Sequence, residues 1–331
     1  MRQFIVNAHV VDDQNIGDLV SSPLRYFPFP GFETQTLDLR ALGQAAATSA
    51  DTAASTQRVL GLPQLADGDR CHLIVGGGGL IAPRFLSGIQ QLQQVELGDR
   101  AQRIVWGIGQ QNYGRRPTGN QSLVNALVQA SQRFDYEPYL AGFDLLGIRD
   151  HEANDPNVAW VPCASCLHPA FDRDYPIEHE FVVFSHKKFQ IYVDRLPRIT
   201  NESNDLESIL RFLGSGETIL TSSYHGAYWG LLLGRKVLAF PFSTKFVTLK
   251  HQPGYYPLKN WRDQVIRVRP FRQGFLNKIS FEFRYGNKYS CRTRGWQTAL
   301  KDCQSYDGIL QEYRDRNQQY YQQVMERLTQ A

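Results

Sequence analysis

The chain has 331 residues, more than one hydrophobic core usually serves, so two domains are expected. Its 36 basic and 32 acidic residues leave a net charge of only +4, far from the dense basic surface of a nucleic-acid binder, so no nucleic-acid partner is expected. No apolar run approaches the roughly 20 residues that span a bilayer, and residues 1–6 lead into a strand-like run without the apolar core of a signal peptide. Five cysteines, an odd number, argue against a disulfide framework and favour the cytoplasm.

The first half of the chain alternates short apolar runs with helical stretches, as βα units do. The predicted strands are Gln3–Val6, Thr36–Leu39, His72–Val75, Ile104–Ile108, Leu140–Phe143 and Val158–Val161. The predicted helices are Asp18–Tyr26, Arg84–Leu97 and Gln121–Arg133. Several of these strands are apolar on both faces, which predicts a parallel sheet covered by helices.

A second alternation follows a proline-containing linker at His168–Glu180. Its predicted strands are Phe181–Phe184, Thr218–Thr221 and Val237–Phe240, and its predicted helices are Leu206–Leu213 and Ala227–Leu233. A long polar helix is predicted over Ser305–Leu328. The expected fold is therefore α/β, with Rossmann-like domains over residues 1–172 and 173–304 and a helix over 305–331 that packs back across them. Because open α/β sheets bind ligands at the carboxyl ends of their strands, functional residues should come just after strands.

The first candidate motif, Asn15-Ile16-Gly17-Asp18, follows the first strand and opens a helix. Gly17 permits a close ligand approach, and a helix N-terminus offers unpaired N–H groups. The alternative is that Asp18 simply caps the helix.

Two glycine-rich motifs follow predicted strands, Gly76-Gly77-Gly78-Gly79 and Gly107-Ile108-Gly109. Consecutive glycines raise the cost of ordering the chain, so a bare backbone must serve a purpose, either ligand approach or close helix–strand contact. Neither run has the Gly-Lys-Ser/Thr of a phosphate-binding P-loop. In Gly147-Ile148-Arg149-Asp150, Arg149 could pair with an anionic substrate, or with Asp150 on the surface.

The sharpest motif is Thr221-Ser222-Ser223-Tyr224-His225-Gly226, which carries hydroxyl groups and a histidine from a strand to the start of a helix. The helix dipole favours a neutral imidazole there and an anionic substrate favours the charged form, so His225 is suited to proton transfer. A structural histidine is the alternative. Lys245, after the next strand, could reach the same cleft, or be solvated.

Cys163-Ala-Ser-Cys166-Leu-His168 has a zinc-like spacing, but no second ligand pair with suitable spacing exists. Buried structural thiols are the preferred interpretation, and no metal site is predicted.

Taken in order, these motifs resemble the polysaccharide pyruvyltransferase family. The match comprises Asn15-x-Gly17-Asp18, the Gly76–Gly79 run, Gly107-x-Gly109, Arg149-Asp150, Ser222-x-x-His225-Gly226, Gly234-Arg235-Lys236 and Lys245, over most of residues 1–250. Members of this family commonly carry an arginine two positions before the histidine, where this chain has Ser223.

The resemblance implies a fold similar to glycosyltransferase type B and the transfer of a pyruvyl group from phosphoenolpyruvate to a sugar, as a ketal. It implies no cofactor beyond this donor. His225 would handle the proton, Asp18 would activate the acceptor hydroxyl, and Arg149 and Lys245 would clamp the donor, with Lys187, Lys188 and Arg235 as further candidates. The expected substrate-binding residues are Asn15, Gly17, Gly77, Gly78, Gly79, Gly109, Arg149, Ser222, Ser223, Tyr224, Gly226 and Lys245.

Two other functions stay open at this point, a nucleotide-sugar glycosyltransferase of the same fold and an inactive glycan-binding protein. The expected partner is a sugar or a lipid-linked glycan. The basic, aromatic stretch Arg262–Arg294 leaves open a contact with the inner face of a membrane.

Overall fold

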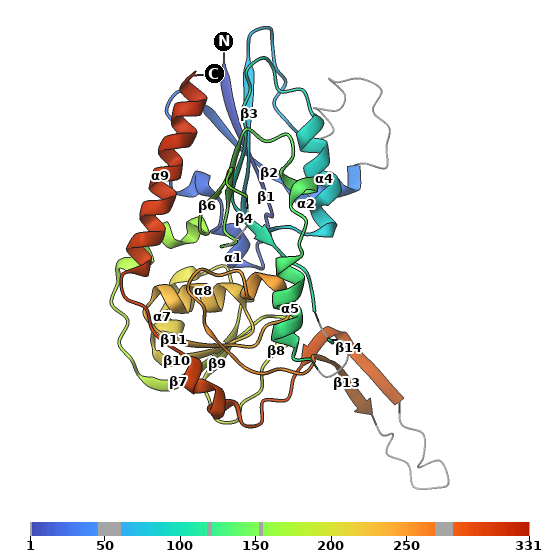
Figure 1. The fold of residues 1–331 in the computed structure, drawn as a ribbon, viewed down its shortest axis with the longest axis vertical. Coiled ribbons are helices and arrows are strands. Elements are labelled where there is room, and N and C mark those ends of the chain that lie inside the picture. The colour runs from blue at the N-terminus through green and yellow to red at the C-terminus, as the bar shows by residue number, and fades with distance from the viewer. Residues whose placement is uncertain are drawn as a thin grey trace.

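The computed structural model describes residues 2–45, 61–114, 116–117, 121–151, 155–268 and 281–330. Within these ranges the chain forms two α/β lobes, each built on a parallel sheet, and a long C-terminal helix (Figure 1). The architecture is α/β, with two Rossmann-like lobes on parallel sheets and a long C-terminal helix, as the sequence predicts.

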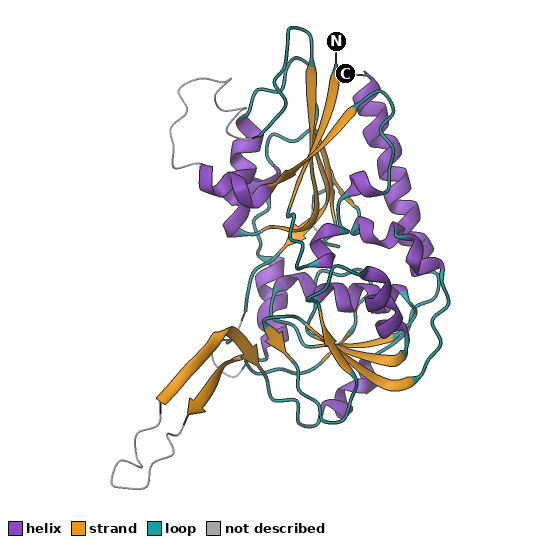
Figure 2. Ribbon diagram, turned by 180° about the vertical axis from the view of Figure 1, so that it is seen from behind, coloured by secondary structure: helices purple, strands orange, loops and turns teal. Residues whose placement is uncertain are grey.

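The first lobe contains a six-stranded parallel sheet in the order β2-β1-β3-β4-β5-β6. Its strands are β1 (Gln3–His9), β2 (Glu33–Asp38), β3 (Arg70–Ile81), β4 (Arg103–Gln110), β5 (Leu145–Ile148) and β6 (Val158–Trp160). Helices α2 (Leu39–Ala45) and α4 (Pro83–Gln94) cover one face, and α9 (Ile309–Gln330) covers the other (Figure 2). The central strands are buried on both faces, which explains their nearly continuous apolar sequences.

The second lobe contains a five-stranded parallel sheet in the order β12-β11-β10-β7-β9. Its strands are β7 (His179–Ser185), β9 (Arg198–Thr200), β10 (Gly216–Thr221), β11 (Lys236–Ala239) and β12 (Gly254–Tyr255). Helices α7 (Leu206–Gly214) and α8 (Tyr224–Leu232) pack on this sheet. The short helical turns η2 (Ala164–Leu167), η3 (Pro169–Asp172), η4 (Thr244–Phe246) and η5 (Trp296–Asp302) surround the same core.

Helix α5 (Leu123–Gln132) is reached from the first lobe but packs on the second. The segment before it pairs with the second lobe, because Gly114 N donates to Phe242 O at 2.8 Å. Leu123 N donates to Leu258 O at 3.0 Å, and the Leu123 side chain is buried in the core of the second lobe. The chain therefore crosses between the lobes here before the short helix α6 (Glu137–Leu140) returns it to the first.

Helix α9 contacts both lobes. Tyr320 OH donates to Val105 O in the first sheet at 2.6 Å, and Asn317 Oδ1 accepts from Trp106 Nε1 at 3.0 Å. At its N-terminal end, Tyr313 is buried in the core of the second lobe. Among the described residues, no helix is long and apolar enough to cross a membrane.

A third, small sheet has the order β13-β14-β8, from β13 (Arg262–Val268), β14 (Phe281–Ser290) and β8 (Phe189–Gln190). The two longer strands form an antiparallel hairpin that extends away from the second lobe (Figure 2). This hairpin lies within the basic, aromatic stretch of the sequence, of which residues 269–280 lie outside the described residues.

Two of the predicted elements are wrong, and a third, the C-terminal helix, is confirmed with a later start. The predicted helix Asp18–Tyr26 ends after one turn, as α1 (Ile16–Leu19), because Pro23 holds Ser22 in an extended conformation, and η1 (Pro23–Arg25) follows. The predicted strand Leu140–Phe143 is the end of α6 and a turn at Gly142, whose φ is +75°. The C-terminal helix begins at Ile309, since Gly308 has a φ of +72°.

The glycine-rich motifs also differ from the predicted loops. Gly76–Gly79 lie inside the twelve-residue strand β3, and Gly107–Gly109 lie inside β4. The register of the β3–β4 pair shifts between Gly78 and Ile81, so the glycines distort the strand near its carboxyl end rather than following it.

Candidate functional site

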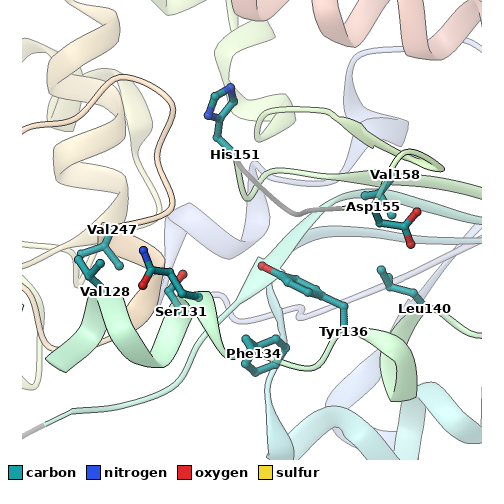
Figure 3. Close-up of a pocket in the computed structure, with 10 residues that line it drawn as sticks. Val128, Ser131, Phe134, Tyr136, Leu140, His151, Asp155, Val158 and Val247 are labelled. Carbon is teal, nitrogen blue, oxygen red and sulfur yellow. The ribbon is translucent and has the colours of Figure 1, made fainter. Parts of the chain in front are cut away.

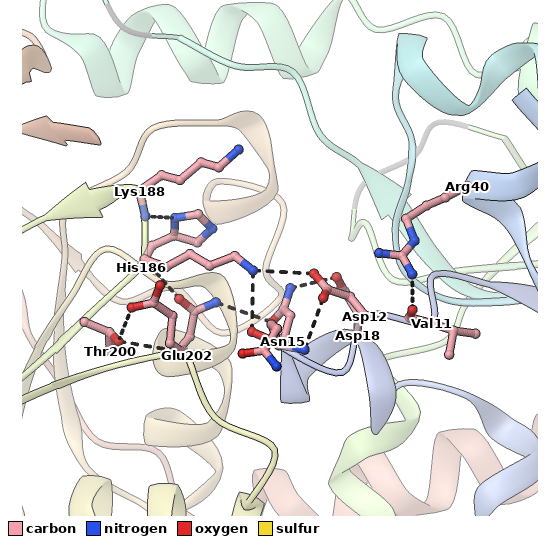
Figure 4. Close-up of polar contacts among 12 residues, drawn as sticks. Val11, Asp12, Asn15, Asp18, Arg40, His186, Lys188, Thr200 and Glu202 are labelled. Atoms are coloured by element: carbon pink, nitrogen blue, oxygen red, sulfur yellow. Dashed lines mark hydrogen bonds and ion pairs between the residues drawn. The ribbon is translucent and has the colours of Figure 1, made fainter. Parts of the chain in front are cut away.

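The turn before α1 and the segment after β7 bring the two lobes together (Figure 4). Lys187 Nζ lies 3.4 Å from Asp12 Oδ2, and Asn201 Nδ2 donates to Asn15 Oδ1 at 3.3 Å. A backbone bond from Ile16 N to Ser203 O, at 3.1 Å, adds to this contact. These bonds hold the Asn15–Asp18 motif against the second lobe.

A pocket of about 310 Å³ opens at this junction. Its charged lining residues are five cations and two carboxylates, Arg40, Arg84, Lys187, Lys188 and Lys245 against Asp12 and Asp18. Its other lining residues are Val10, Asn15, Gly79, Leu80, Phe85, Gln111, Tyr113 and His186. We call this the cationic pocket. Its excess of positive charge favours an anionic ligand.

Two of the cations are already engaged by the protein. Arg40 pairs with Asp38, with Nη2 at 2.7 Å from Oδ2, and Lys187 pairs with Asp12. Arg84 is held more loosely, with Nη2 at 3.4 Å from Gln111 Oε1. Arg84, Lys188 and Lys245 are therefore the cations best placed to bind a ligand.

Asp18 and Lys245 are half-buried, and their pKa values are shifted in opposite directions. Burial raises the pKa of Asp18, although Lys245 and Arg149 oppose this effect. Burial and repulsion from Arg149 lower the pKa of Lys245 to about 7, and the attraction of Asp18 acts against them. Lys245 therefore gains and loses its proton near neutral pH, as a group that transfers protons should.

Asp18 does not cap its helix. Asn15 occupies the N-cap position, and the Asp18 Oδ2 atom accepts from Asn15 Nδ2 at 2.7 Å. The alternative of a purely capping aspartate is wrong, since the carboxylate lies in the pocket instead.

Arg149 follows β5 and is 4% exposed, directly behind the cationic pocket. Its guanidinium carbon lies 4.1 Å from the centre of the Tyr224 ring. Among the described residues, none accepts a hydrogen bond from Arg149 Nε or Nη1, so these two buried donors are unpaired in the protein. A surface pairing with Asp150 is excluded, because both side chains are buried.

Gly109 makes room for Arg149, because a Cβ there would lie 2.8 Å from Arg149 Nε. Gly79 makes room for Gln111, because a Cβ there would overlap the side-chain oxygen of Gln111. Gly77 serves a different purpose, since its Cβ would lie 2.4 Å from Ser21 O, and its φ is +86°. Gly78 has a φ of +93° and lies against Asp18. The glycine-rich strands therefore serve both close packing and the site.

His225 is the second residue of α8, but it does not line the cationic pocket. Its ring packs on Gly17, where a Cβ would lie 2.1 Å from His225 Nδ1, and stacks on Trp229 at 4.9 Å. Its Nε2 lies 3.9 Å from Cys163 Sγ. Burial, with repulsion from Arg149 and Lys245, holds its pKa well below the usual range, so the ring is neutral.

His186, which was not predicted as a site residue, does line the pocket. Its Nδ1 accepts from Lys188 N at 3.1 Å, so in the neutral ring the proton is on Nε2. Burial and repulsion from Lys245, Lys187 and Lys188 keep its pKa well below the usual range. The signal in the sequence was a histidine directly after a strand, beside two lysines.

The hydroxyl residues before His225 hold the loops in place. Ser222 Oγ accepts from His186 N at 3.0 Å, which positions His186. Ser223 is the N-cap of α8, and its Oγ accepts from Gly226 N at 3.4 Å. A Cβ at Gly226 would lie 2.4 Å from Thr221 Oγ1, so this glycine is required by packing.

Other predicted candidates lie elsewhere. Arg235 donates to Gly214 O at 2.8 Å and therefore serves the second lobe, away from the pocket. Cys163 and Cys166 are buried free thiols. Within the described ranges, no three metal-ligating side chains gather into a potential metal site.

No protein-family model matches this chain, and no curated protein sequence matches it. Among solved structures, it is similar to a putative UDP-N-acetylglucosamine 2-epimerase from Listeria monocytogenes, with a TM-score of 0.40 and 10% identity over 74% of this chain and 81% of the other. It is also similar to the uncharacterized protein KP1_0663 from Klebsiella pneumoniae, with a TM-score of 0.32 and 14% identity over 72% of this chain and 83% of the other.

Proposed function

We propose that this protein is a glycan-modifying transferase that takes its group from a small phosphorylated carboxylate, phosphoenolpyruvate. The observation that carries the proposal is the cationic pocket, where five cationic side chains line the junction between the lobes and the buried Arg149 lies behind them. A donor with a phosphate and a carboxylate needs such a set of cations. The type of reaction, pyruvyl transfer, is proposed from the resemblance of the sequence motifs to pyruvyltransferases.

Arg149 offers a substitute for the arginine that pyruvyltransferases commonly carry at the position of Ser223. Ser223 caps α8, and the Arg149 guanidinium lies on the ring of the next residue, Tyr224. Arg149 thus brings a cation to the same turn from the other lobe. This contact supports an anionic donor despite the serine.

The proposed reaction has two steps, an addition and a displacement. A proton reaches the methylene carbon of phosphoenolpyruvate while a sugar hydroxyl adds at the neighbouring carbon. A second hydroxyl of the same sugar then displaces phosphate, so the products are the cyclic pyruvyl ketal and inorganic phosphate. Each hydroxyl loses one proton, of which one becomes part of the new methyl group and the other leaves with the phosphate.

Asp18 and Lys245 are the groups we assign to these proton transfers. Burial raises the pKa of Asp18 and lowers the pKa of Lys245 to about 7, and both side chains line the cationic pocket. The Nε2–H of His186 is available to the departing phosphate, since Lys188 N occupies Nδ1. His225, behind the pocket, acts as a positioning residue that holds Gly17 and the α1 turn.

The test is thermal stabilisation of the purified protein by phosphoenolpyruvate, followed by phosphate release with sugar acceptors. Arg84→Gln should weaken the stabilisation by about tenfold or more in affinity, because it removes a charged hydrogen-bond donor. Arg211→Gln, on an exposed face of α7, is the matched control and should bind normally. Stabilisation by nucleotide sugars instead would favour the glycosyltransferase. No effect of either donor, with glycan binding retained, would favour the inactive binding protein.

A further inference from the structure

A second pocket, of about 350 Å³, lies where α5, the α6 turn and the second lobe approach one another (Figure 3). Its volume is within the range of small-molecule sites, about 300–1,000 Å³. We call it the aromatic pocket. The lining residues that matter for its chemistry are Ser131, Phe134, Tyr136, His151, Asp155 and Val247.

The aromatic pocket differs from the cationic pocket in charge. Among the described residues that line it, none is a lysine or an arginine. The rings of Phe134 and Tyr136 meet edge to face, with their centres 5.0 Å apart, and give the pocket an apolar wall. A phosphate or a carboxylate would meet the Asp155 carboxylate without a lysine or arginine to pair with, so the pocket disfavours an anionic ligand.

The polar groups of this pocket are oriented in advance. Gln110 Nε2 donates to Ser131 Oγ at 3.0 Å and to Tyr136 OH at 2.8 Å. Tyr136 OH in turn donates to Asp150 Oδ2 at 3.1 Å. No described residue accepts the Ser131 hydroxyl proton, so this O–H can donate to a ligand oxygen.

This network is itself held rigidly. Asp150 is 2% exposed, and it also accepts from Gln110 N at 2.6 Å and from Thr248 Oγ1 at 2.8 Å. Thr248 belongs to the second lobe, so the network joins the lobes at the floor of the pocket. Burial and the neighbouring Asp150 raise the pKa of Tyr136, so its hydroxyl keeps its proton.

We infer that the aromatic pocket binds an uncharged sugar ring. Such a ring presents hydroxyl groups at its edge and C–H groups on its faces, which matches fixed polar groups beside aromatic side chains. Because the pocket carries no donor-binding cation, this inference stands whether or not the donor is phosphoenolpyruvate.

The test uses saturation-transfer NMR on the full-length protein with glucose, galactose and N-acetylglucosamine, and with glucuronic acid as the charged comparison. At least one uncharged sugar should give a saturable signal, and glucuronic acid should bind at least tenfold more weakly. Val128→Trp should weaken this binding at least tenfold, because Val128 lines the pocket on α5. Val124→Trp, one turn earlier on the same helix and outside the lining, is the matched control and should bind normally.

A second, smaller substitution keeps the test decisive if the Val128→Trp variant does not fold. Ser131→Ala should weaken sugar binding about fivefold, the effect of one neutral hydrogen bond. The inference is overturned if no uncharged sugar of the panel binds, if Val128→Trp and Ser131→Ala bind as well as the natural protein, or if glucuronic acid binds as tightly as the uncharged sugars.

Discussion

Lys245 should make anion binding depend on pH near neutrality. Its pKa is lowered to about 7, so the ammonium is fully charged well below pH 7 and loses its charge as the pH rises through 7. Sulfate is the clean probe, because it keeps two negative charges over this range. A hydrogen bond to a charged group contributes about 1.5–3 kcal/mol, which corresponds to about 10- to 150-fold in affinity.

The assay is calorimetric titration of sulfate at pH 6, 7, 8 and 9. The natural protein should bind at least tenfold more tightly at pH 6 than at pH 9. Lys245→Met keeps most of the aliphatic stem and removes the charge, so its affinity should be low and nearly constant. Lys188→Met, at the exposed rim of the same pocket, should weaken binding but keep the pH dependence.

The charge of Lys245, which favours anion binding, should lower the stability of the folded protein, and thermal denaturation tests this. The folded state lowers the pKa of Lys245 below its unfolded value of 10.5, so the charge destabilises the folded protein at neutral pH, and this cost falls as the pH rises from 7 to 10.5. Lys245→Met should therefore raise the melting temperature at pH 7. If Lys245→Met kept the pH dependence of sulfate binding and melted at a lower temperature, the assignment of a half-buried titrating lysine would be wrong.

Two further variants test the histidines and the C-terminal helix. His186→Ala should lower turnover about 10²-fold or more with little change in melting temperature. His225→Ala should lower both turnover and melting temperature, because its ring fills the space beside Gly17. If kinetics and thermal denaturation showed the reverse pattern, the proton-transfer role would belong to His225. Asn317→Ala should lower the free energy of unfolding, measured by urea denaturation, by about 2–4 kcal/mol. The substitution removes the buried hydrogen bonds to Trp106 Nε1 and Pro162 O and leaves both groups unpaired. A loss below about 1 kcal/mol would show that α9 is not anchored there.

The two-lobed fold was predictable because it rests on local patterns. Parallel strands that are covered by helices on both faces are mostly apolar, and this property is visible in Ile104–Ile108 without any tertiary information. The same patterns place polar residues at the carboxyl ends of strands. Asn15, Asp18, Gly79 and Lys245 were predicted on that ground, and they line one pocket.

Element boundaries were predicted less well where a single residue decides them. Pro23 ends a helix whose apolar pattern continues, and Gly308 delays the start of the last helix by a few residues. In such places the backbone conformation of one residue outweighs the pattern of its neighbours.

The tertiary structure alone decided which histidine faces the pocket and where the second lobe begins. Both His186 and His225 follow strands, and only the bond from His186 N to Ser222 Oγ and the packing of Gly17 on His225 place one in the pocket and the other behind it. Likewise, α5 looks like any helix of the first lobe, but Leu123 and Leu127 are buried in the core of the second. Sequence patterns report which face of an element is buried; what it is buried against depends on contacts between residues far apart in the chain.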